Sequence, residues 1–355
     1  MFRYILPSVG QTLKLERKCP HCRKTSGNIH SGLGQRSIKD LKVSKISQRR
    51  MKCPWCGITW TIRPEGMGPG RWRSERLRGL GVILYMLGLS YRAVERFLPC
   101  LECPAGKSSI ERDVDEFGQK AREYHHCAPR TRINILGVDG TGAAMAGKDA
   151  GILFFTDIEG QKLVLVEAVQ EKDSDKLRRH VAKVMAAVGA GELRSDEHSA
   201  YRGIVPEEQH RLCLTHWLKS KAKRASELYG QALLENRPLE AESMKRLLAI
   251  LRLKPRPPTA PLELERLVRS YIHCRQGLLW KINQLLQHVE RTWEQVSDDA
   301  VDPTNNVTER IIGLTLKIRA KTMRGFKSQR KVLDHIYLSN FLRGQEGICD
   351  LRKVS

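Results

Sequence analysis

Residues 133–139, Ile-Asn-Ile-Leu-Gly-Val-Asp, form a short apolar run that ends in an acid and is followed by glycine. Two further apolar runs, 151–156 and 162–169, are separated by the sequence Asp-Ile-Glu-Gly at 157–160. Runs of this length bounded by turn residues predict β-strands, and the short connection predicts a hairpin. We therefore expect three antiparallel strands, the first of which ends at Asp139.

A helix and a fourth strand follow in the sequence. Residues 174–188 place Leu177, Val181 and Val184 on one face of a helix. Residues 192–195 then lead into a second acid, Asp196. Three antiparallel strands, a helix and a strand ending in an acid are the opening of a ribonuclease-H-like fold, although other α/β folds share parts of this order.

The charge of the chain points to a polyanionic partner. Its 355 residues include 62 Lys+Arg and 39 Asp+Glu, a formal net charge of +23. That excess favours nucleic acid or an anionic membrane surface as the partner. Residues 1–80 carry +14 of this charge, and residues 310–333 contain eight basic residues and no acidic one. We expect two contact regions on nucleic acid, or one long region.

The apolar content is sufficient for buried cores but not for a membrane span. Hydrophobic residues make up 41% of the chain, and the length allows two or three domains. The longest nearly apolar stretch, 79–89, is about half of the ~20 residues that a membrane span needs. Residues 1–10 lack the pattern of a secretory signal. We therefore expect a cytoplasmic, nucleoid-associated protein without a membrane partner.

Four of the ten cysteines form two Cys-x-x-Cys pairs, Cys19/Cys22 and Cys53/Cys56. Two such pairs can supply the four thiolates of one tetrahedral zinc site. The 30 residues between the pairs exceed the usual gap of about 15–20 residues, and we interpret 32–47 as an extended hairpin arm. The sequence predicts a zinc ribbon over 1–66. Unligated, reduced pairs are the alternative.

A third pair, Cys100 and Cys103, has no second pair to complete a site. Cys127 with His125 or His126 could act as partners, and we interpret Cys100 and Cys103 as ordinary loop cysteines.

Residues 72–126 read as three helices, at 74–87, 91–98 and 108–124, and predict a helix-turn-helix module. Ser90 is expected to cap the second helix, and Ser108 or Ser109 the third. In such a module the start of the third helix enters the DNA major groove. The predicted groove contacts are Lys107, Ser108, Ser109 and Arg112. The turn before this helix is longer than usual, and a helical linker bundle without groove contact is the alternative.

Three acids have the pattern of a metal-dependent phosphoryl-transfer site. Asp139 and Asp196 end predicted strands, and Glu309 begins a predicted helix. Two carboxylates on adjacent strand ends and one from a helix can hold two Mg²⁺ ions about 4 Å apart. Each acid alone also fits an ordinary role in a turn or at a helix start.

The joint pattern resembles a known family. The sequence Arg-Leu-Cys-Leu-Thr-His-Trp at 211–217 lies between the second Asp and the Glu. The chain is similar to insertion-sequence transposases of the DDE, ribonuclease-H-like superfamily, in the branch with a Cys-x-x-His element at this place, to which Mutator-like elements and several bacterial insertion sequences belong. Tyr201 after the second Asp, and Asn305 and Asn306 before the Glu, also match this branch. The resemblance covers about 132–333.

The resemblance implies a catalytic core over 132–345 in which Asp139, Asp196 and Glu309 are the catalytic Mg²⁺ ligands. Mn²⁺ is expected to substitute for Mg²⁺. Cys213 and His216 are expected to have a structural role beside the active site, with an ordinary buried Cys and His as the alternative. The basic stretch after the Glu helix resembles the Lys/Arg-rich DNA-contacting segment of the family, here Lys317, Arg319, Lys321, Arg324 and Lys327.

The separation of 113 residues between Asp196 and Glu309 predicts a helical insertion at about 220–300. The Pro-rich linker 254–261 divides this insertion into two halves. Other acids leave alternatives for each ligand. Those for the third ligand are Glu294, Asp298, Asp299 and Asp302, and Asp157 and Glu197 compete for the first and second positions.

The sequence thus predicts a multidomain α+β protein with a zinc ribbon, a helix-turn-helix module and a ribonuclease-H-like core. The resemblance implies a transposase that binds element ends, cuts them and joins them to target DNA. It also implies a homo-oligomer assembled on DNA, with one structural Zn²⁺ and two Mg²⁺ ions per chain. The alternatives are a nuclease or resolvase of the same fold that does not join strands, and a zinc-dependent DNA-binding regulator with an inactive core.

Overall fold

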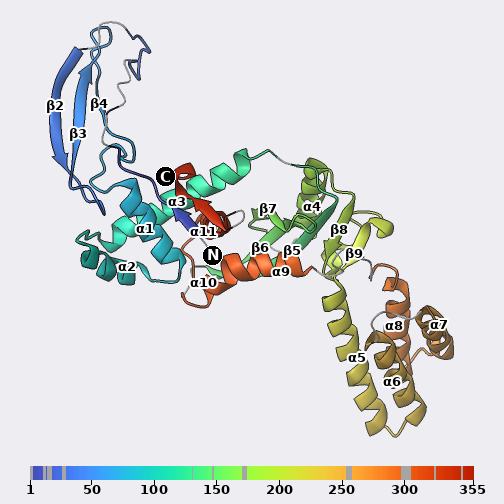
Figure 1. The fold of residues 1–355 in the computed structure, drawn as a ribbon. Helices are drawn as coiled ribbons and strands as arrows, with labels where there is room; N and C mark the ends of the chain where they lie inside the picture. Colours follow the sequence, from blue (N-terminus) through green and yellow to red (C-terminus); the bar gives the residue numbers. More distant parts are fainter. Residues whose placement is uncertain are drawn as a thin grey trace. The chain divides into compact units, whose positions relative to one another are not determined.

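The computed structural model packs into two compact units, 1–128 with 314–355 and 129–313 (Figure 1). The structure describes the chain apart from the short segments named below. For residues 29–31 and 148–150 it describes the backbone but not the side chains. No helix among the described residues is long and apolar enough to cross a membrane. The segments outside the description are 1–2, 11–12, 14–17, 26–28, 130, 146–147, 170–173, 253–257, 297–304, 324 and 345–346.

The N-terminal part of the first unit is a small antiparallel sheet in the order β2-β3-β4. β2 (Ile29–Ser37) and β3 (Lys45–Lys52) form the long hairpin that the sequence predicts between the two cysteine pairs. β4 (Thr59–Ile62) pairs with β3 after the second cysteine pair. A small core of Val9, Ile38, Ile46 and Met67 closes the base of the sheet.

Helices make up the remainder of the first unit. The three helices of 72–126 are present as α1 (Glu75–Met86), α2 (Tyr91–Phe97) and α3 (Lys107–Cys127), with a 3-10 turn, η1 (Leu98–Leu101), between the last two. The Ser90 hydroxyl caps α2 by accepting the Ala93 N–H, as expected. The expected serine cap of α3 is wrong, because the helix begins earlier and Gly106 is the N-cap residue.

The C-terminal segment belongs to the first unit. α11 (Gln329–Arg343) packs along α3, and its Leu338 and Leu342 lie in the same core as Val114 and Phe117. The unit boundary near residue 313 therefore differs from the expected core of 132–345. The apolar face of α11 is buried against α3, and the pattern of one helix does not specify which partner covers it. The remaining elements here are β1 (Arg3–Ile5), α10 (Ile318–Ala320), β10 (Ile348–Asp350) and η5 (Leu351–Lys353), with β1 and β10 paired in parallel.

The second unit is built on a mixed five-stranded sheet in the order β7-β6-β5-β8-β9. β5, β6 and β7 are antiparallel, and β8 and β9 continue the sheet in parallel with β5. α4 (Ser174–Val188) packs its Leu177, Val181 and Val184 into the core of the sheet. The strands are β5 (Ile135–Met145), β6 (Lys148–Asp157), β7 (Lys162–Glu167), β8 (Glu192–Ser195) and β9 (His210–Leu212).

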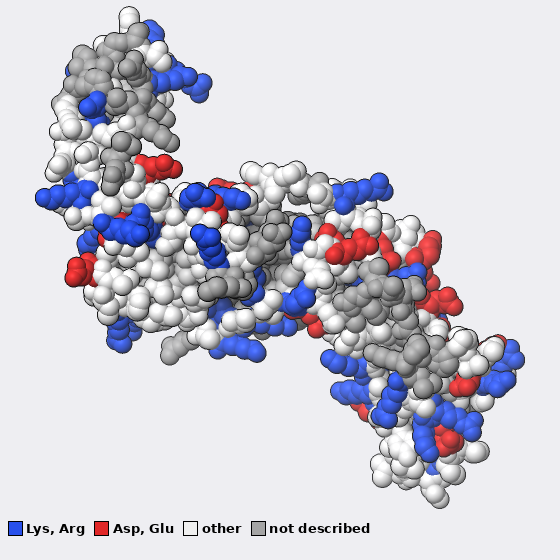
Figure 2. Space-filling model, in the orientation of Figure 1, with Lys and Arg blue, Asp and Glu red and all other residues white. Residues whose placement is uncertain are grey.

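Four helices between β9 and the last helix of this unit form a bundle with its own core, as the length of the interval predicted. They are α5 (Leu214–Leu234), α6 (Pro238–Arg252), α7 (Ala260–Tyr271) and α8 (Gly277–Thr292). The first half of the expected Pro-rich linker, 254–257, lies outside the described residues. Figure 2 shows Lys and Arg side chains spread over the bundle surface.

The unit ends with α9 (Asn306–Ile312), which runs into a π-helical turn, η4 (Gly313–Lys317). Two short 3-10 turns, η2 (Ser199–Tyr201) and η3 (Glu207–Gln209), connect β8 to β9. The protein therefore has an α+β structure, with a four-cysteine cluster near its N-terminus and a mixed five-stranded sheet flanked by helices.

Candidate functional site

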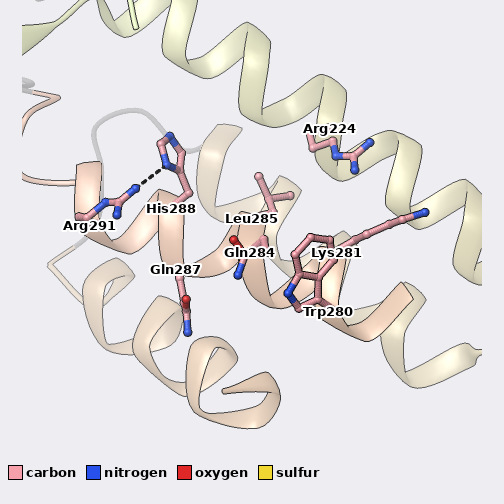
Figure 3. A pocket seen from close by; sticks show the side chains of 8 residues that line it. All are labelled: Arg224, Trp280, Lys281, Gln284, Leu285, Gln287, His288 and Arg291. Carbon is pink, nitrogen blue, oxygen red and sulfur yellow. Dashed lines mark hydrogen bonds between the residues drawn. The ribbon is translucent and has the colours of Figure 1, made fainter. Parts of the chain in front are cut away.

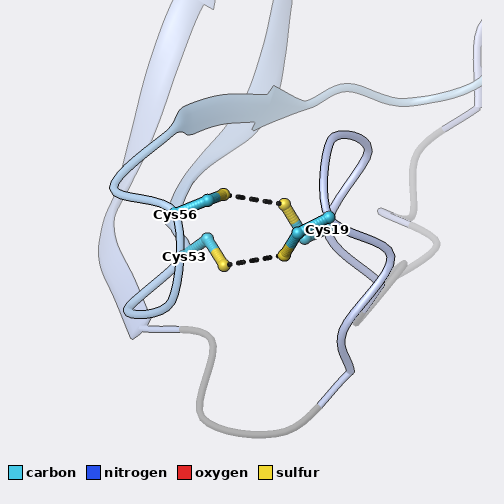
Figure 4. Close-up of side chains that lie close together, drawn as sticks. Cys19, Cys53 and Cys56 are labelled. Atoms are coloured by element: carbon cyan, nitrogen blue, oxygen red, sulfur yellow. Dashed lines mark hydrogen bonds between the residues drawn. The ribbon is translucent and has the colours of Figure 1, made fainter.

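The two Cys-x-x-Cys pairs come together at one point (Figure 4). The sulfur atoms of Cys19 and Cys56 lie 3.6 Å apart, and those of Cys22 and Cys53 lie 3.5 Å apart. All four sulfur atoms lie within 4.8 Å of one another, and none of these cysteines is in a disulfide. This donor set fits a tetrahedral four-thiolate zinc site, so the cluster could bind one structural zinc ion.

Each pair has the same local backbone design. Cys19 N–H donates to the Lys24 carbonyl at 3.0 Å, and Cys53 N–H donates to the Ile58 carbonyl at 2.9 Å. The residue after each pair has a positive φ, 59° at Arg23 and 72° at Gly57. The left-handed residue turns the chain back so that both thiols of a pair face the same side.

Burial raises the pKa of the Cys19 thiol, but backbone N–H groups of Cys22 and His21 and neighbouring thiols outweigh it and lower the pKa to about 6. The pKa of Cys53 is also lowered, because N–H groups of Cys56 and Trp55 outweigh the effect of burial. The thiolate is the form that binds metal. The backbone of each turn thus favours the ligand form of its first cysteine.

Cys100 and Cys103 are not part of this cluster or of any other potential metal cluster among the described residues. Cys100 is exposed, and the Cys103 thiol donates to the Asp40 carbonyl at 3.3 Å.

In the second unit, three predicted site residues lie at or beside the ends of β8 and β9, and we call them, with His216 and Glu309, the strand-end site. The expectation that the first strand ends at Asp139 is wrong, because β5 continues to Met145 and Asp139 pairs with Phe154 of β6. The last β5–β8 pair is Gly137 with Arg194, and Asp139 and Asp196 each lie two residues further along the chain. The last pair between β8 and β9 is Ser195 with Leu212. The next residue on each side is Asp196 after β8 and Cys213 after β9. The Cys213 N–H donates to the Ser195 carbonyl at 2.8 Å. Because neighbouring strands lie about 4.8 Å apart, these residues form one row.

Glu309 reaches this region from α9. The helix packs against β5, β6 and β7, and Glu309 lies in its first turn. The ligand atoms of Cys213, His216 and Glu309 all lie within 4.8 Å of one another, with His216 Nε2 3.4 Å from Glu309 Oε1. This cluster joins the third expected acid to the Cys-x-x-His element, whereas Asp139 and Asp196 lie in the row and outside this cluster.

The Cys-x-x-His element has the electrostatics of an ion pair. The Cys213 side chain, with Coulombic support from Glu309 and Asp139, outweighs burial and raises the pKa of His216 to about 9. Burial raises the pKa of Cys213, but hydrogen bonds from His216 and from the Asn305 N–H outweigh it, so this pKa is lowered. His216 therefore carries a positive charge at neutral pH, beside carboxylates that would otherwise repel one another.

Asn305 joins α9 to the sheet, a role that the sequence reasoning missed. Its side-chain amide donates to the Val138 carbonyl at 2.9 Å, and its backbone N–H donates to Cys213 Sγ at 3.2 Å. Its side-chain oxygen accepts the Thr308 hydroxyl, which also lies 2.6 Å from the Thr156 hydroxyl. All of these groups are buried. The network fixes the start of α9 next to Asp139 and so determines where Glu309 points.

Glu197 has a structural role that competes with its expected role as a ligand. Lys221 Nζ donates to both of its oxygens at 2.7 Å, and His288 Nε2 contacts it as well. Both partners belong to the bundle, on α5 and α8. Glu197 therefore ties the bundle to the loop that carries Asp196. An acid held by two bundle residues is not recognisable from spacing along the chain.

Among the alternatives for the third ligand, Glu294 offers its backbone carbonyl to Arg211 Nη1 at 2.7 Å. Asp298, Asp299 and Asp302 lie outside the described residues.

The predicted DNA contacts of α3 lie at the surface. Lys107, Ser108 and Arg112 are exposed, and Ser109 is half-buried. They belong to the first turns of the helix, and its N-cap is Gly106.

The predicted basic stretch divides into different environments. Lys317 and Lys321 are exposed, and Lys327 donates to Glu111 at 2.7 Å. The structure disagrees with Arg319 as a surface contact, because this residue is only 8% exposed. Its guanidinium donates to the carbonyls of Gly88 and Leu89 and lies over the Tyr85 ring. Arg324 lies outside the described residues.

No protein-family model matches the chain, and a search of curated proteins found no significant relative.

Proposed function

We propose that the protein is a DNA transposase of the DDE type, with a ribonuclease-H-like core that cuts the ends of a DNA element and joins them to a target. The observation that carries this proposal is that Asp139 lies within β5 and Asp196 at the end of the adjacent β8, while Glu309 approaches from α9, which packs on β5. In this proposal the three carboxylates are the ligands of the catalytic metal ions.

The oxygen donors suit Mg²⁺, which prefers carboxylates and water as ligands. Glu309 Oε1 is buried and has no hydrogen-bond partner among the described residues, and the charged His216 Nε2 lies 3.4 Å from it. Two Mg²⁺ ions, when bound, would stabilise the attacking and leaving oxygens of a phosphoryl transfer. The chain's own contribution is to fix the positions of the carboxylates. Asn305 anchors α9, and His216 holds Glu309 by charge.

The first unit would then recognise DNA. Within it, α1 to α3 form a helix-turn-helix module in this proposal, and the zinc ribbon adds a second contact. A cleft of about 990 Å³ lies beside the start of α3. Its lining contains five basic and two acidic side chains. The basic residues are Lys39, Arg71, Arg73, Arg112 and Arg330. Arg71, Arg73 and Arg330 pair with acidic residues, so the positive charge available to a polyanion comes mainly from the other two.

The test is strand cleavage of a plasmid that carries the reading frame with its native flanking DNA. Asp139→Asn, Asp196→Asn and Glu309→Gln each keep the size of the side chain and remove its charge. Each should abolish cleavage with Mg²⁺ and leave DNA binding nearly intact, because basic surfaces carry binding. Asp175→Asn, an exposed acid in the first turn of α4, is the matched control and should cleave normally.

Two results would change the proposal. If Glu309→Gln cleaved normally and Glu294→Gln or Asp302→Asn were inactive, the third ligand would be wrong while the mechanism stood. If all three main substitutions cleaved like the parent protein, the transposase mechanism would fail.

A further inference from the structure

A cleft of about 430 Å³ lies on the bundle between α5 and α8, beside the core residue Leu285. Figure 3 shows Arg224 on one helix facing Trp280, Lys281 and Leu285 on the other. Its volume is within the range of small-ligand sites. The lining residues are Arg224, Trp280, Lys281, Gln284, Leu285, Gln287, His288 and Arg291.

The lining combines positive charge with an exposed aromatic ring. Arg224, Lys281 and Arg291 line the cleft, and none of the acidic side chains that the structure describes does. Arg224 also pairs with Glu227, but both side chains are about half exposed, and such surface pairs contribute little. The cleft therefore keeps a net positive charge and attracts an anionic group.

Trp280 is unusual among the aromatic residues of the bundle. Trp217 is completely buried in the bundle core, whereas Trp280 is 44% exposed at the cleft. The core face of α8 is made by other residues, including Ile282, Leu286 and Val289. The indole ring is thus available to a ligand, and its flat face suits another ring.

Hydrogen bonds connect the cleft to the loop that carries Asp196. Arg291 Nη2 donates to His288 Nδ1 at 3.1 Å, and the other ring nitrogen of His288 contacts Glu197. Glu197 is also held by Lys221 and directly follows Asp196. The bundle, including the wall of the cleft, is therefore fixed against the loop that carries one of the candidate catalytic acids.

We propose that this cleft binds an unpaired nucleotide of a DNA strand, with the base stacked on Trp280 and the phosphates at Lys281, Arg224 and Arg291. This inference rests on the proposed function and adds a DNA contact of the bundle to it. A base within a duplex has both faces covered by its neighbours, so an indole can stack only on a base that has left the helix. Gln284 and Gln287 offer amide groups for its edge.

The experiment measures binding of the full chain to a fluorescent 20-nucleotide oligothymidylate and to a blunt duplex of equal length. Trp280→Ala should weaken binding to the single strand about five-fold or more, since base stacking is lost. Binding to the duplex should change by less than about two-fold, because a duplex offers no free base. Trp280→Phe keeps a ring and should retain most of the affinity.

A charge variant and its matched control test the phosphate contact. Lys281→Gln should reduce the slope of log K against log salt by about 0.7 for the single strand. Lys245→Gln removes an exposed lysine of α6 that lies outside the cleft, and it should leave the slope unchanged. Thermal melts of each variant confirm that the bundle is folded.

Several outcomes would overturn the inference. Unchanged binding of the single strand by Trp280→Ala would do so, and so would equal effects of Lys281→Gln and Lys245→Gln. Thymidine monophosphate that competes as well as the oligonucleotide would assign the cleft to free nucleotides. Hexaglutamate binding that depends on Lys281 but not on Trp280 would assign it to an acidic protein segment.

The proposed function and this inference fail in different ways. If the parent protein bound no DNA, both would fail. If the parent protein cleaved DNA while Trp280→Ala bound the single strand normally, only the role of the cleft would be lost.

Discussion

The four-cysteine cluster and the strand-end site bring their residues together in different ways. The cluster is made from two short turns, each of which aims its own pair of thiols by the same backbone hydrogen bonds. The strand-end site draws Asp139, Asp196, Cys213, His216 and Glu309 from a sheet and two helices. Each half of the first site is formed by a few neighbouring residues, whereas the second site depends on the register of the sheet and on one buried asparagine.

This difference predicts which substitutions should disrupt each site. A local turn aims its ligands whatever the rest of the chain does, so the cluster should be sensitive mainly to its thiols and to the backbone of the turns. The residues of the strand-end site are spread over 171 positions of the chain. This site should therefore also be sensitive to substitution of side chains that are not ligands. The predictions below test this contrast, from the largest expected effect to the smallest.

Loss of one thiol should abolish the cluster. Cys53→Ser leaves three thiolates, and structural zinc sites need all four ligands to couple binding to folding. We expect metal analysis to give about one Zn²⁺ per parent chain and almost none for the variant. The melting transition of the second unit should be unchanged. Cys100→Ser, at an exposed cysteine outside the cluster, should keep its zinc, and a zinc-free parent protein would contradict the ribbon.

Loss of Asn305 should damage the strand-end site without touching a candidate ligand. Asn305→Ala removes the side-chain donor to the Val138 carbonyl and leaves the Thr308 hydroxyl with Thr156 as its remaining partner. We expect a loss of about 1–3 kcal/mol in unfolding free energy, the cost of one unsatisfied buried group. Cleavage should fall as well, because Glu309 is no longer held in place.

The neighbouring residue provides the control for this prediction. Asn306→Ala, at an exposed position of the same helix, should change the unfolding free energy by less than about 0.5 kcal/mol in urea denaturation. Equal effects of the two substitutions would mean that Asn305 does not join α9 to the sheet.

The charge on His216 should make the second unit sensitive to pH. Its pKa is raised to about 9 in the folded protein, against about 6.5 in an unfolded chain. The stability that this shift contributes is complete below about pH 6.5 and is lost as the pH rises through 9. Because the side chain is 41% exposed, we expect about 1 kcal/mol after solvent screening.

The measurement is an NMR titration of His216 in EDTA-treated protein. Cys213→Ala should move the titration midpoint down, because the Cys213 side chain is the main cause of the raised pKa. Cys274→Ala, in the bundle, should not move it. If the titration midpoint were the same in the parent protein and in Cys213→Ala, the ion pair between Cys213 and His216 would be contradicted.

The smallest expected effect concerns the two cysteine turns. Gly57 has a φ of 72°, and there is open space where a side chain would begin. Gly57→Ala should therefore cost only the left-handed backbone strain, about 1 kcal/mol, which corresponds to about five-fold weaker zinc binding. Arg23→Gly should have the opposite sign, because Arg23 has the same backbone conformation with a side chain.

Arg23→Ala separates charge from conformation, since it removes the charge and keeps the strain. Competition with a zinc-binding dye measures all three affinities. Equally tight binding by Arg23→Ala and Arg23→Gly would show that charge, and not the backbone, sets the difference between the two turns.

Much of the local structure was predictable from the sequence. The helix at 174–188 and the strand at 192–195 coincide with the structure, and the three helices of the first unit agree within a few residues. The pairing of the cysteines was predictable because each Cys-x-x-Cys is a self-contained turn. The start of α3 was missed, because two serines are stronger cap signals than the glycine that caps the helix.

The partners of buried side chains were not predictable. Arg319 lies in a basic run typical of a DNA contact, yet its guanidinium is buried on Gly88 and Leu89. Glu197 has the sequence position of a ligand, yet Lys221 and His288 hold it. In each case the partner lies in a distant segment, so no local pattern carries the information.

The sequence by itself determined the elements, the cysteine pairs and the positions of the acids in the chain, because strand, helix and turn preferences act over a few residues. Only the tertiary structure decided that α11 packs on α3, that Cys213 and His216 meet Glu309, and that Asn305 holds α9 against β5. Such contacts depend on which apolar faces pack together and in what register. That choice is made by the whole chain when it buries its surface.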